Sequence, residues 1–223
     1  MKLLALDTAT EAVSAALWIE GAIRAQYAVA PREQARRILP MIDALLADAG
    51  LRPLDLDALA FGRGPGSFTG VRIAAGVVQG MAFAADLPVV PVSTLAALAQ
   101  AALDADTQVE GVLAAIDARM NEVYHAAYAR GADGLALLQG EEGVCPAERI
   151  AVPATGRWLA AGTGWDSYGE TLAARLGDRL AGDSGVRYPA AADMLPLAVR
   201  DFEAGVRLPP EQAVPVYLRD KVV

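Results

Sequence analysis

Apolar residues near the start of the chain follow a strand pattern that changes into a helical one. Residues 2–7, 12–19 and 22–29 are short apolar runs separated by turn residues, which is typical of three consecutive strands. From residue 32 to residue 49 apolar side chains recur every three or four positions, and this spacing predicts a helix. Pro40 lies inside that helix and is expected to kink it or to delay its start.

The pattern then alternates between strands and helices. Residues 58–62 and 88–92 read as short buried strands, and helices are expected over 67–85 and 93–103, each beginning at a residue that can cap it. Three strands followed by helix, strand, helix, strand and helix produce a mixed sheet with helices packed on it. This α/β order is that of the ribonuclease-H-like fold, which the actin-like ATPases and sugar kinases use.

A second copy of the opening segment occurs later in the chain. Residues 113–128 align without gaps on residues 3–18 with an offset of 110, so that Asp117 corresponds to Asp7. Each copy reads as strand, aspartate, turn and strand. Two apolar hairpins can resemble each other by chance, but an internal duplication is the favoured interpretation.

The second half of the chain is a less complete copy. Residues 130–153 show no clear pattern, and a short strand and two helices, over 166–176 and 193–204, follow them. We therefore expect two ribonuclease-H-like subdomains with mixed sheets flanked by helices. The first, residues 1–105, carries helices for a partner interface, and the second, residues 106–223, is degenerate.

Composition and charge exclude several classes of function. The chain has 223 residues and a net charge of −8, whereas a protein that grips nucleic acid on its own usually carries a basic face. Any contact with nucleic acid would therefore be local or supplied by a partner. The single cysteine, Cys145, and the single histidine, His125, exclude an internal disulfide and an ordinary zinc site. His125 lies far in sequence from Cys145 on a predicted strand, which argues against a nucleophilic site.

No segment has the pattern of a membrane span or an export signal. The most apolar stretch, residues 71–85, contains Arg72 and Gln79 and falls short of the ~20 apolar residues that a bilayer needs. The apolar run at the N-terminus ends at Asp7, which is too early for a signal peptide. Together with the unpaired cysteine, these features predict a cytoplasmic protein without membrane contact.

Two loops occupy the places where actin-like ATPases bind phosphate. The first, residues 7–10, has the aspartate but lacks the glycine that lets the backbone approach phosphate, so a plain turn is favoured there. The second, residues 62–70, is rich in glycine and precedes a helix, where exposed amides can hold an anion. A sharp strand-to-helix turn with Phe68 packed inward explains that loop equally well. The candidate contacts for a nucleotide or anion are Asp7, Gly64, Gly66 and Ser67.

The helices over 32–49 and 67–85 have more apolar surface than one sheet face can cover. Small residues recur at helical spacing in the second of them, which lets another helix approach to about 8 Å. Such surplus apolar surface indicates a partner interface. The candidate interface residues are Arg36, Leu39, Ile42, Leu46, Val71, Ala74, Ala75, Val78 and Met81.

Five segments together resemble the bacterial TsaB (YeaZ) family over nearly the whole chain. They are residues 4–11, 31–33, 62–72, 115–120 and 215–219, of which Gly62-Arg-Gly-Pro-Gly-Ser-Phe-Thr-Gly-Val-Arg72 is specific enough to carry the resemblance alone. The resemblance implies an actin-like fold and a role in making threonylcarbamoyladenosine beside the anticodon of tRNA. Gln34 departs from the family, whose members carry histidine after Arg-Glu, and this departure bears on partner geometry.

The resemblance also implies which protein of the complex performs the chemistry. In this family the chemistry belongs to the paralogue TsaD, which has a metal site with a His-x-x-x-His pair, and TsaB pairs with TsaD through its first two helices. The ATPase TsaE joins them, and tRNA is reached only through the complex. A chain with one histidine cannot contain His-x-x-x-His, so we expect a non-catalytic scaffold that has no catalytic residues and no metal site. A homodimer in isolation, ATP or ADP with Mg²⁺ at a partner contact, and a weak nucleotide-binding or ATPase module remain open alternatives.

Overall fold

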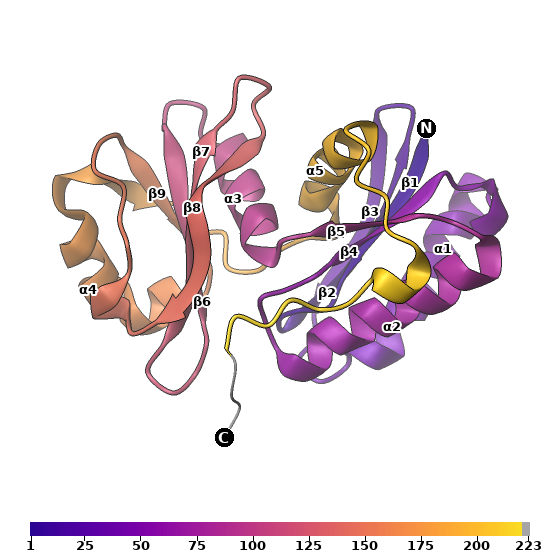
Figure 1. The fold of residues 1–223 in the computed structure, drawn as a ribbon, viewed down its shortest axis with the longest axis horizontal. Coiled ribbons are helices and arrows are strands. Elements are labelled where there is room, and N and C mark those ends of the chain that lie inside the picture. Colours follow the sequence, from indigo (N-terminus) through magenta and orange to yellow (C-terminus); the bar gives the residue numbers. More distant parts are fainter. Residues whose placement is uncertain (220–223) are drawn as a thin grey trace. The chain divides into compact units, whose positions relative to one another are not determined.

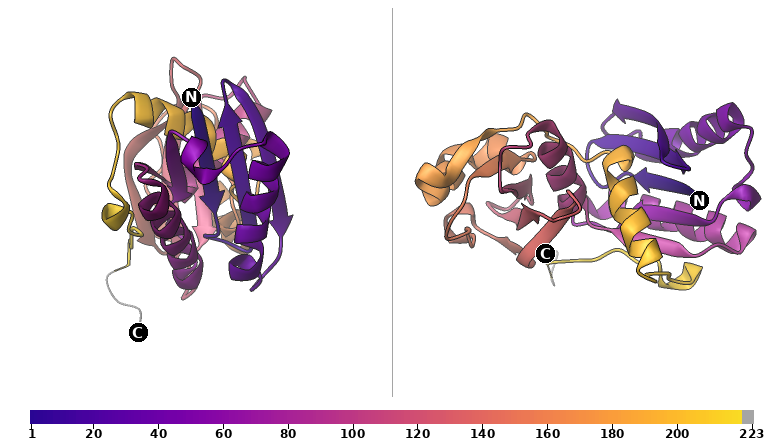
Figure 2. Two further views of the ribbon diagram at one scale, coloured as in Figure 1. Left: turned by 90° about the vertical axis from the view of Figure 1, so that its right-hand side faces the viewer. Right: turned by 90° about the horizontal axis from the view of Figure 1, so that it is seen from above.

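Two five-stranded mixed sheets, each with its own helices, form the protein (Figures 1 and 2). The computed structural model describes residues 1–219. The chain folds into two compact units, which we call unit 1 and unit 2. Unit 1 contains Met1–Thr94 and Ala190–Val216, and unit 2 contains Leu95–Pro189 and, within the described part of the chain, residues 217–219.

The sheet of unit 1 has the strand order β3-β2-β1-β4-β5. The first three strands form an antiparallel meander, and the last two run parallel to β1 because helical crossovers precede them. The strands are β1 (Lys2–Asp7), β2 (Ala12–Ile19), β3 (Ala22–Val29), β4 (Ala58–Gly62) and β5 (Val89–Val92), and the helices of this unit are α1 (Gln34–Ala49), α2 (Phe68–Ala85) and α5 (Ala191–Glu203).

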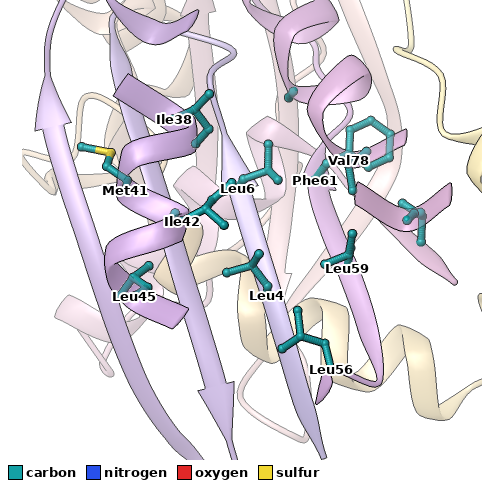
Figure 3. Close-up of a cluster of buried hydrophobic side chains, with 14 of the residues drawn as sticks. Leu4, Leu6, Ile38, Met41, Ile42, Leu45, Leu56, Leu59, Phe61 and Val78 are labelled. Atoms are coloured by element: carbon teal, nitrogen blue, oxygen red, sulfur yellow. The ribbon is translucent and has the colours of Figure 1, made fainter. Parts of the chain in front are cut away.

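Helices α1 and α2 cover one face of this sheet. Figure 3 shows their contact with the sheet, where Ile38 and Ile42 of α1 and Val78 of α2 meet Leu6 and Phe61. All of these side chains are almost completely buried. The hydrophobic effect on this face therefore fixes the register of the strands, because a shift by one residue would turn their apolar side chains away from the helices.

Helix α5 covers the opposite face of the same sheet (Figure 1). The side chains beneath it are small and buried, as at Ala5 and Ala16, so the helix can approach the strands closely. The hydroxyl of Ser14 on β2 accepts a hydrogen bond of 2.9 Å from the backbone N–H of Ala191 at the start of α5.

The helix ends agree with the sequence prediction. Ser67 caps α2, and its hydroxyl accepts a hydrogen bond of 3.3 Å from the backbone N–H of Gly70. Gly50 ends α1 in the left-handed conformation, which glycine adopts without steric cost. Pro40 does not delay the start of α1, because the helix begins at Gln34 and runs through it.

Unit 2 repeats the topology of unit 1, with the strand order β10-β9-β6-β7-β8. A meander of three strands is again followed by two parallel strands with a helix between them, which confirms the predicted repeat. Its strands are β6 (Gly111–Asp117), β7 (Val123–Arg130), β8 (Ala136–Cys145), β9 (Trp158–Ala161) and β10 (Leu180–Asp183), and its helices are α3 (Thr94–Ala105) and α4 (Gly164–Leu176). The stretch 130–153, which lacked a pattern in sequence, contains β8.

The gapless alignment of the two copies is wrong by one residue on the first strand. Leu4 and Leu6 face the helices in unit 1, and their counterparts in unit 2 are Leu113 and Ala115. The offset between the two copies is therefore 109 on the first strand. On the second strand, Leu17 and Ala127 keep the offset of 110, because the turn between the two strands is one residue longer in unit 2 than in unit 1. Asp117 is consequently not the counterpart of Asp7. Asp117 accepts a hydrogen bond from Ser167 of α4, the helix that covers the core face in unit 2. Asp7 lies on the other face of its sheet, which α5 covers.

The boundaries of the compact units differ from the predicted boundary at residues 105 and 106. Helix α3 belongs mainly to unit 2, and α5 returns to unit 1 from the end of the chain. Local sequence pattern predicted both helices but could not tell which sheet each one covers.

Candidate functional site

The glycine-rich loop between β4 and α2 packs tightly on the turn between β1 and β2. A Cβ atom added at Gly66 would lie 2.3 Å from the carbonyl oxygen of Ala9, and one added at Gly70 would lie 2.1 Å from that of Thr8. Neither distance is sterically allowed. These glycines are therefore required because two backbone segments approach each other closely.

Polar groups of this loop bond to the same turn. The backbone N–H of Ser67 donates to the carbonyl oxygen of Ala9 at 2.7 Å, and the hydroxyl of Thr8 donates to that of Gly70 at 2.7 Å. Phe68 does not pack inward as one prediction had it. Its ring is half exposed, and the guanidinium group of Arg72 lies 3.4 Å from the ring centroid. The geometry favours the packing interpretation of the loop over an anion site.

Asp7 lies at the end of β1 in a site without water access. One carboxylate oxygen accepts a hydrogen bond of 3.0 Å from the backbone N–H of Ala9, and the other, Oδ2, is buried without a hydrogen-bond partner. Burial raises the pKa of Asp7 from 3.8 to about 7. Gly62 makes room for this carboxyl group, because a Cβ atom there would overlap Oδ2.

These residues do not fit a magnesium-bound nucleotide. The Oδ2 atom of Asp7 is buried beside Gly62, and the Gly62–Gly70 loop is packed against the β1–β2 turn, so neither offers an open surface to a phosphate group and its cation. Within residues 1–219, no group of three or more histidine, cysteine, aspartate and glutamate side chains is placed to hold a metal ion.

The predicted interface residues divide into a buried and an exposed set. Arg36 and Leu39 of α1 are exposed, and Met81 of α2 is partly exposed. The remaining ones lie in the core of unit 1 and are unavailable to a partner, because the sheet covers them: Ile42, Leu46, Val71, Ala74, Ala75 and Val78. The sequence pattern predicted both helices, but most of the residues that it assigned to their outer faces lie on the faces that pack in the core.

Another row of α2 is the one that faces solvent. Its exposed positions are Arg72, Gly76, Gly80 and Phe83, and we call this row the α2 stripe. Phe83 is 83% exposed, which is unusual for so large an apolar side chain. A Cβ atom at either glycine would meet nothing within 4 Å. Sequence reasoning missed Phe83, although its spacing of three residues from Gly80 signals the same helix face.

An open groove of about 700 Å³ lies along the α2 stripe. Gly76, Gly80 and Phe83 form one side of it, and Pro210 and Glu211 from the segment after α5 form the other. Gln79 fixes that segment by donating a hydrogen bond of 3.0 Å to the carbonyl oxygen of Ala213. Within residues 1–219, α2 is the one helix long and apolar enough to cross a membrane, by length and composition only, and its other face packs in the core.

The start of α1 is anchored to the β1–β2 turn of unit 1. The side-chain amide of Gln34 donates a hydrogen bond of 2.7 Å to the carbonyl oxygen of Thr10 in the β1–β2 turn. Arg36 and Arg37 both pair with Glu33, and this pairing lowers the pKa of the Glu33 carboxyl. The basic residues near the start of α1 are therefore partly neutralised at the surface.

The structure brings His125 and Cys145 together, although they lie far apart in sequence. They occupy the adjacent strands β7 and β8, and Nε2 of His125 lies 3.3 Å from Sγ of Cys145. Burial lowers the pKa of His125 and raises that of Cys145, so the neutral forms of both groups are favoured. A nucleophilic thiolate is favoured by the opposite shifts, so neither pKa direction supports a reactive pair.

The repeated five-stranded sheets define a protein of the actin-like, ribonuclease-H-like class, in which the loops at the ends of β1 and β4 pack on each other. The chain is similar to the tRNA threonylcarbamoyladenosine biosynthesis protein TsaB of Escherichia coli (strain K12), with 46% identity covering 100% of this chain and 96% of that protein. The chain belongs to the TsaB (YeaZ) family.

Other comparisons agree with this assignment. YeaZ from Pseudomonas aeruginosa has a solved structure that matches with a TM-score of 0.90 and 50% identity, over 97% of this chain and 99% of that one. The TsaB protein of Haemophilus influenzae is 44% identical over 100% of this chain and 95% of its own length. A family model described as TsaD, tRNA N6-adenosine threonylcarbamoyltransferase, matches residues 26–173.

Proposed function

We propose that this chain is the non-catalytic scaffold subunit of a complex that makes threonylcarbamoyladenosine in tRNA. Its partner in this proposal is a TsaD-like paralogue, which supplies the catalytic chemistry. The observation that carries the proposal is the α2 stripe, an exposed helix face with small residues in its middle, an exposed phenylalanine at one end and a single charged residue, Arg72.

The α2 stripe has the physical properties of a helix-packing surface. Gly76 and Gly80 leave the backbone bare, so a partner helix can approach to about 8 Å between axes. Phe83 stands beside them and contributes about 1.5–3 kcal/mol when a partner buries its ring completely. Leu39 of α1 is the second exposed apolar residue that we assign to the same contact.

The similarity of the chain to the TsaD family model supports a paralogous partner. Proteins of one fold often associate through equivalent elements, because the same surface is available on both. In isolation, a second copy of this chain is the occupant that we propose for the α2 stripe. A TsaE-like ATPase then joins the complex of the two paralogues.

The electrostatics and the side-chain chemistry support a role without catalysis. The net charge of −8 disfavours an independent grip on tRNA, so in this proposal tRNA binds through the complex in the cytoplasm. The neutral His125–Cys145 pair and the closed loop at Gly62–Gly70 provide no nucleophile and no phosphate site.

The test compares two arginine substitutions at helical glycines where a Cβ atom would meet nothing within 4 Å. Gly80→Arg places a long charged side chain in the middle of the α2 stripe, whereas Gly169→Arg does the same on α4 of unit 2, where nothing lies within 4 Å either. We expect Gly80→Arg to abolish the complex with a TsaD-like paralogue, as measured by analytical ultracentrifugation, and Gly169→Arg to leave it intact. Phe83→Ala should weaken the complex about 10-fold or more, since it removes most of one buried aromatic ring.

Two outcomes would contradict the proposal. One is a complex that survives Gly80→Arg with unchanged affinity, which would place the contact elsewhere. The other is micromolar binding of MgATP to the isolated chain that disappears in Asp7→Asn, which would favour the alternative of a nucleotide-binding module.

A further inference from the structure

The ladder between β7 and β8 in unit 2 is interrupted in its middle. His125 pairs with Gly143 and Ala127 pairs with Gln139, so residues 140–142 lie opposite Ala126 alone. Gly140 makes this bulge with a φ of +83°, a conformation that is strained for other residues. The bulge interrupts the regular pairing of β7 with β8, which is the edge strand of this sheet.

A cavity of about 360 Å³ lies beside this bulge. His125 and Ala127 form its floor on the face of the sheet that α4 also covers, and Gln139, Gly140 and Glu141 form one wall. The opposite wall is the segment 151–155, which leads into Trp158 of β9. The volume is that of a small ligand site and lies near the lower end of the usual range of roughly 300–1,000 Å³.

Hydrogen bonds fix the walls of this cavity. The indole N–H of Trp158 donates to the carbonyl oxygen of Thr155 at 2.7 Å. Arg175 donates to the carbonyl oxygen of Ile150 at 2.7 Å, and Arg179 donates to that of Pro153. The segment 151–155 is therefore held in place before a ligand arrives, which reduces the entropy cost of binding.

The floor is also shaped by a glycine. A Cβ atom at Gly143 would lie 3.1 Å from Nε2 of His125, so glycine gives the imidazole ring room beside the bulge. Burial lowers the pKa of His125, which favours the neutral form of the ring. Glu141 is exposed at the wall and is the one lining residue with a formal charge. The amide N–H groups of Gln139 bond to the carbonyls of Leu137 and Leu138, which leaves its Oε1 as an acceptor.

The lining therefore offers acceptors and one negative charge, with an aromatic side chain and a neutral imidazole beside them. Arg175 and Arg179 donate hydrogen bonds to the carbonyl oxygens of Ile150 and Pro153, and neither lines the cavity. We propose that this cavity in unit 2 is a binding site for a small planar organic cation, with Glu141 as the ion-pair partner. Nothing in the proposed scaffold function uses these residues, so the two proposals stand independently.

The test uses benzamidine as the probe, with neutral benzamide and anionic benzoate as its isosteres. Amide resonances of the isotope-labelled full-length chain are followed during each titration. We expect saturable, millimolar binding of benzamidine that shifts the resonances of residues 139–155. Benzamide should bind about fivefold more weakly, the effect of losing one partly exposed ion pair, and benzoate more weakly still.

Two substitutions locate the site. Glu141→Gln should weaken benzamidine binding about fivefold and leave benzamide binding unchanged, whereas the control Glu148→Gln, at an exposed position outside the cavity, should have no effect. Ala154→Trp should fill the cavity and abolish binding of all probes without lowering the unfolding temperature. Equal affinity for benzamidine and benzoate, shifts confined to other residues, or unchanged binding in Glu141→Gln would overturn the proposal.

Discussion

Asp7 shows how one residue position depends on another that is distant in sequence. The carboxyl group of Asp7 occupies the space that a side chain at position 62 would need, and one of its oxygens has no hydrogen-bond partner. The sequence pattern placed both residues near a phosphate loop, since an aspartate at the end of β1 and a glycine at the end of β4 fit that pattern. Their contact with each other depends on the pairing of β1 with β4, which no local pattern reveals.

The raised pKa of Asp7 predicts a specific pH dependence of stability. The pKa is about 7 in the folded state and near 3.8 when unfolded, so the folded state binds more protons between these values. The contribution of Asp7 to folding stability is therefore full below about pH 4 and is lost as the pH rises through 7, by a total of about 4 kcal/mol. Asp7→Asn should remove this slope.

Urea unfolding of both proteins at pH 4.5 to 8 measures the difference. The stability of Asp7→Asn relative to the natural chain should rise steadily over this range. A control substitution at the exposed residue Asp178 should not change the slope in this way. Parallel curves for Asp7→Asn and the natural chain would show that Asp7 is ionised in the fold at every pH tested.

Helix α2 shows that a sequence pattern can predict an element without showing which of its faces meets the sheet. Its apolar and small residues surround the helix on nearly all sides, so periodicity predicted the helix and not which row meets the sheet. The buried row contains Ala74 and Val78, whereas the exposed row contains Gly76 and Phe83. Strand β8 was missed for the opposite reason, since its glycines and the bulge at Gly140 break the alternation of a regular strand.

Two glycines within α2 should respond to substitution in opposite ways. Gly70→Ala brings a methyl group against the carbonyl oxygen of Thr8 at 2.1 Å, so it should destabilise the protein by about 2 kcal/mol or more. Gly76→Ala meets nothing within 4 Å and should stabilise the helix by about 0.5–1 kcal/mol. Chemical denaturation of the two variants tests this, and a loss of stability of the same size in both would contradict the packing account of the glycine-rich loop.

At the scale of the whole molecule, unit 1 is assembled from both ends of the chain. The strands come from residues 1–94, and α5 comes from the segment after residue 189. A fold with two sheets could be predicted from the repeated order of elements, whereas the packing of α5 on the sheet of unit 1 could not. The small residues on the second face of the sheet, such as Ala5 and Ala16, are the sequence signal for a covering helix, but they do not say which helix it is.

Truncation after Pro189 should therefore damage the N-terminal sheet more than the C-terminal one. It removes Met194, Leu195 and Leu197, which are almost fully buried and together contribute about 5–9 kcal/mol, comparable to the stability of a whole domain. Hydrogen exchange should become fast in β1 and β2 and stay slow in β6 and β7. Equal protection of β1 in the truncated and the full chain would show that α5 is dispensable for unit 1.

The divided origin of unit 1 also sets an order of events during translation. Unit 2 has all the strands of its sheet once the ribosome has passed residue 183, whereas unit 1, although begun first, lacks its covering helix until residue 203 has been made. At elongation rates of roughly 5–20 residues per second, about 6 to 20 s pass between the synthesis of the last strand of unit 1 and the completion of α5. During that interval one face of the sheet is already covered by α1 and α2, whereas the face with Ala5 and Ala16 has no covering helix.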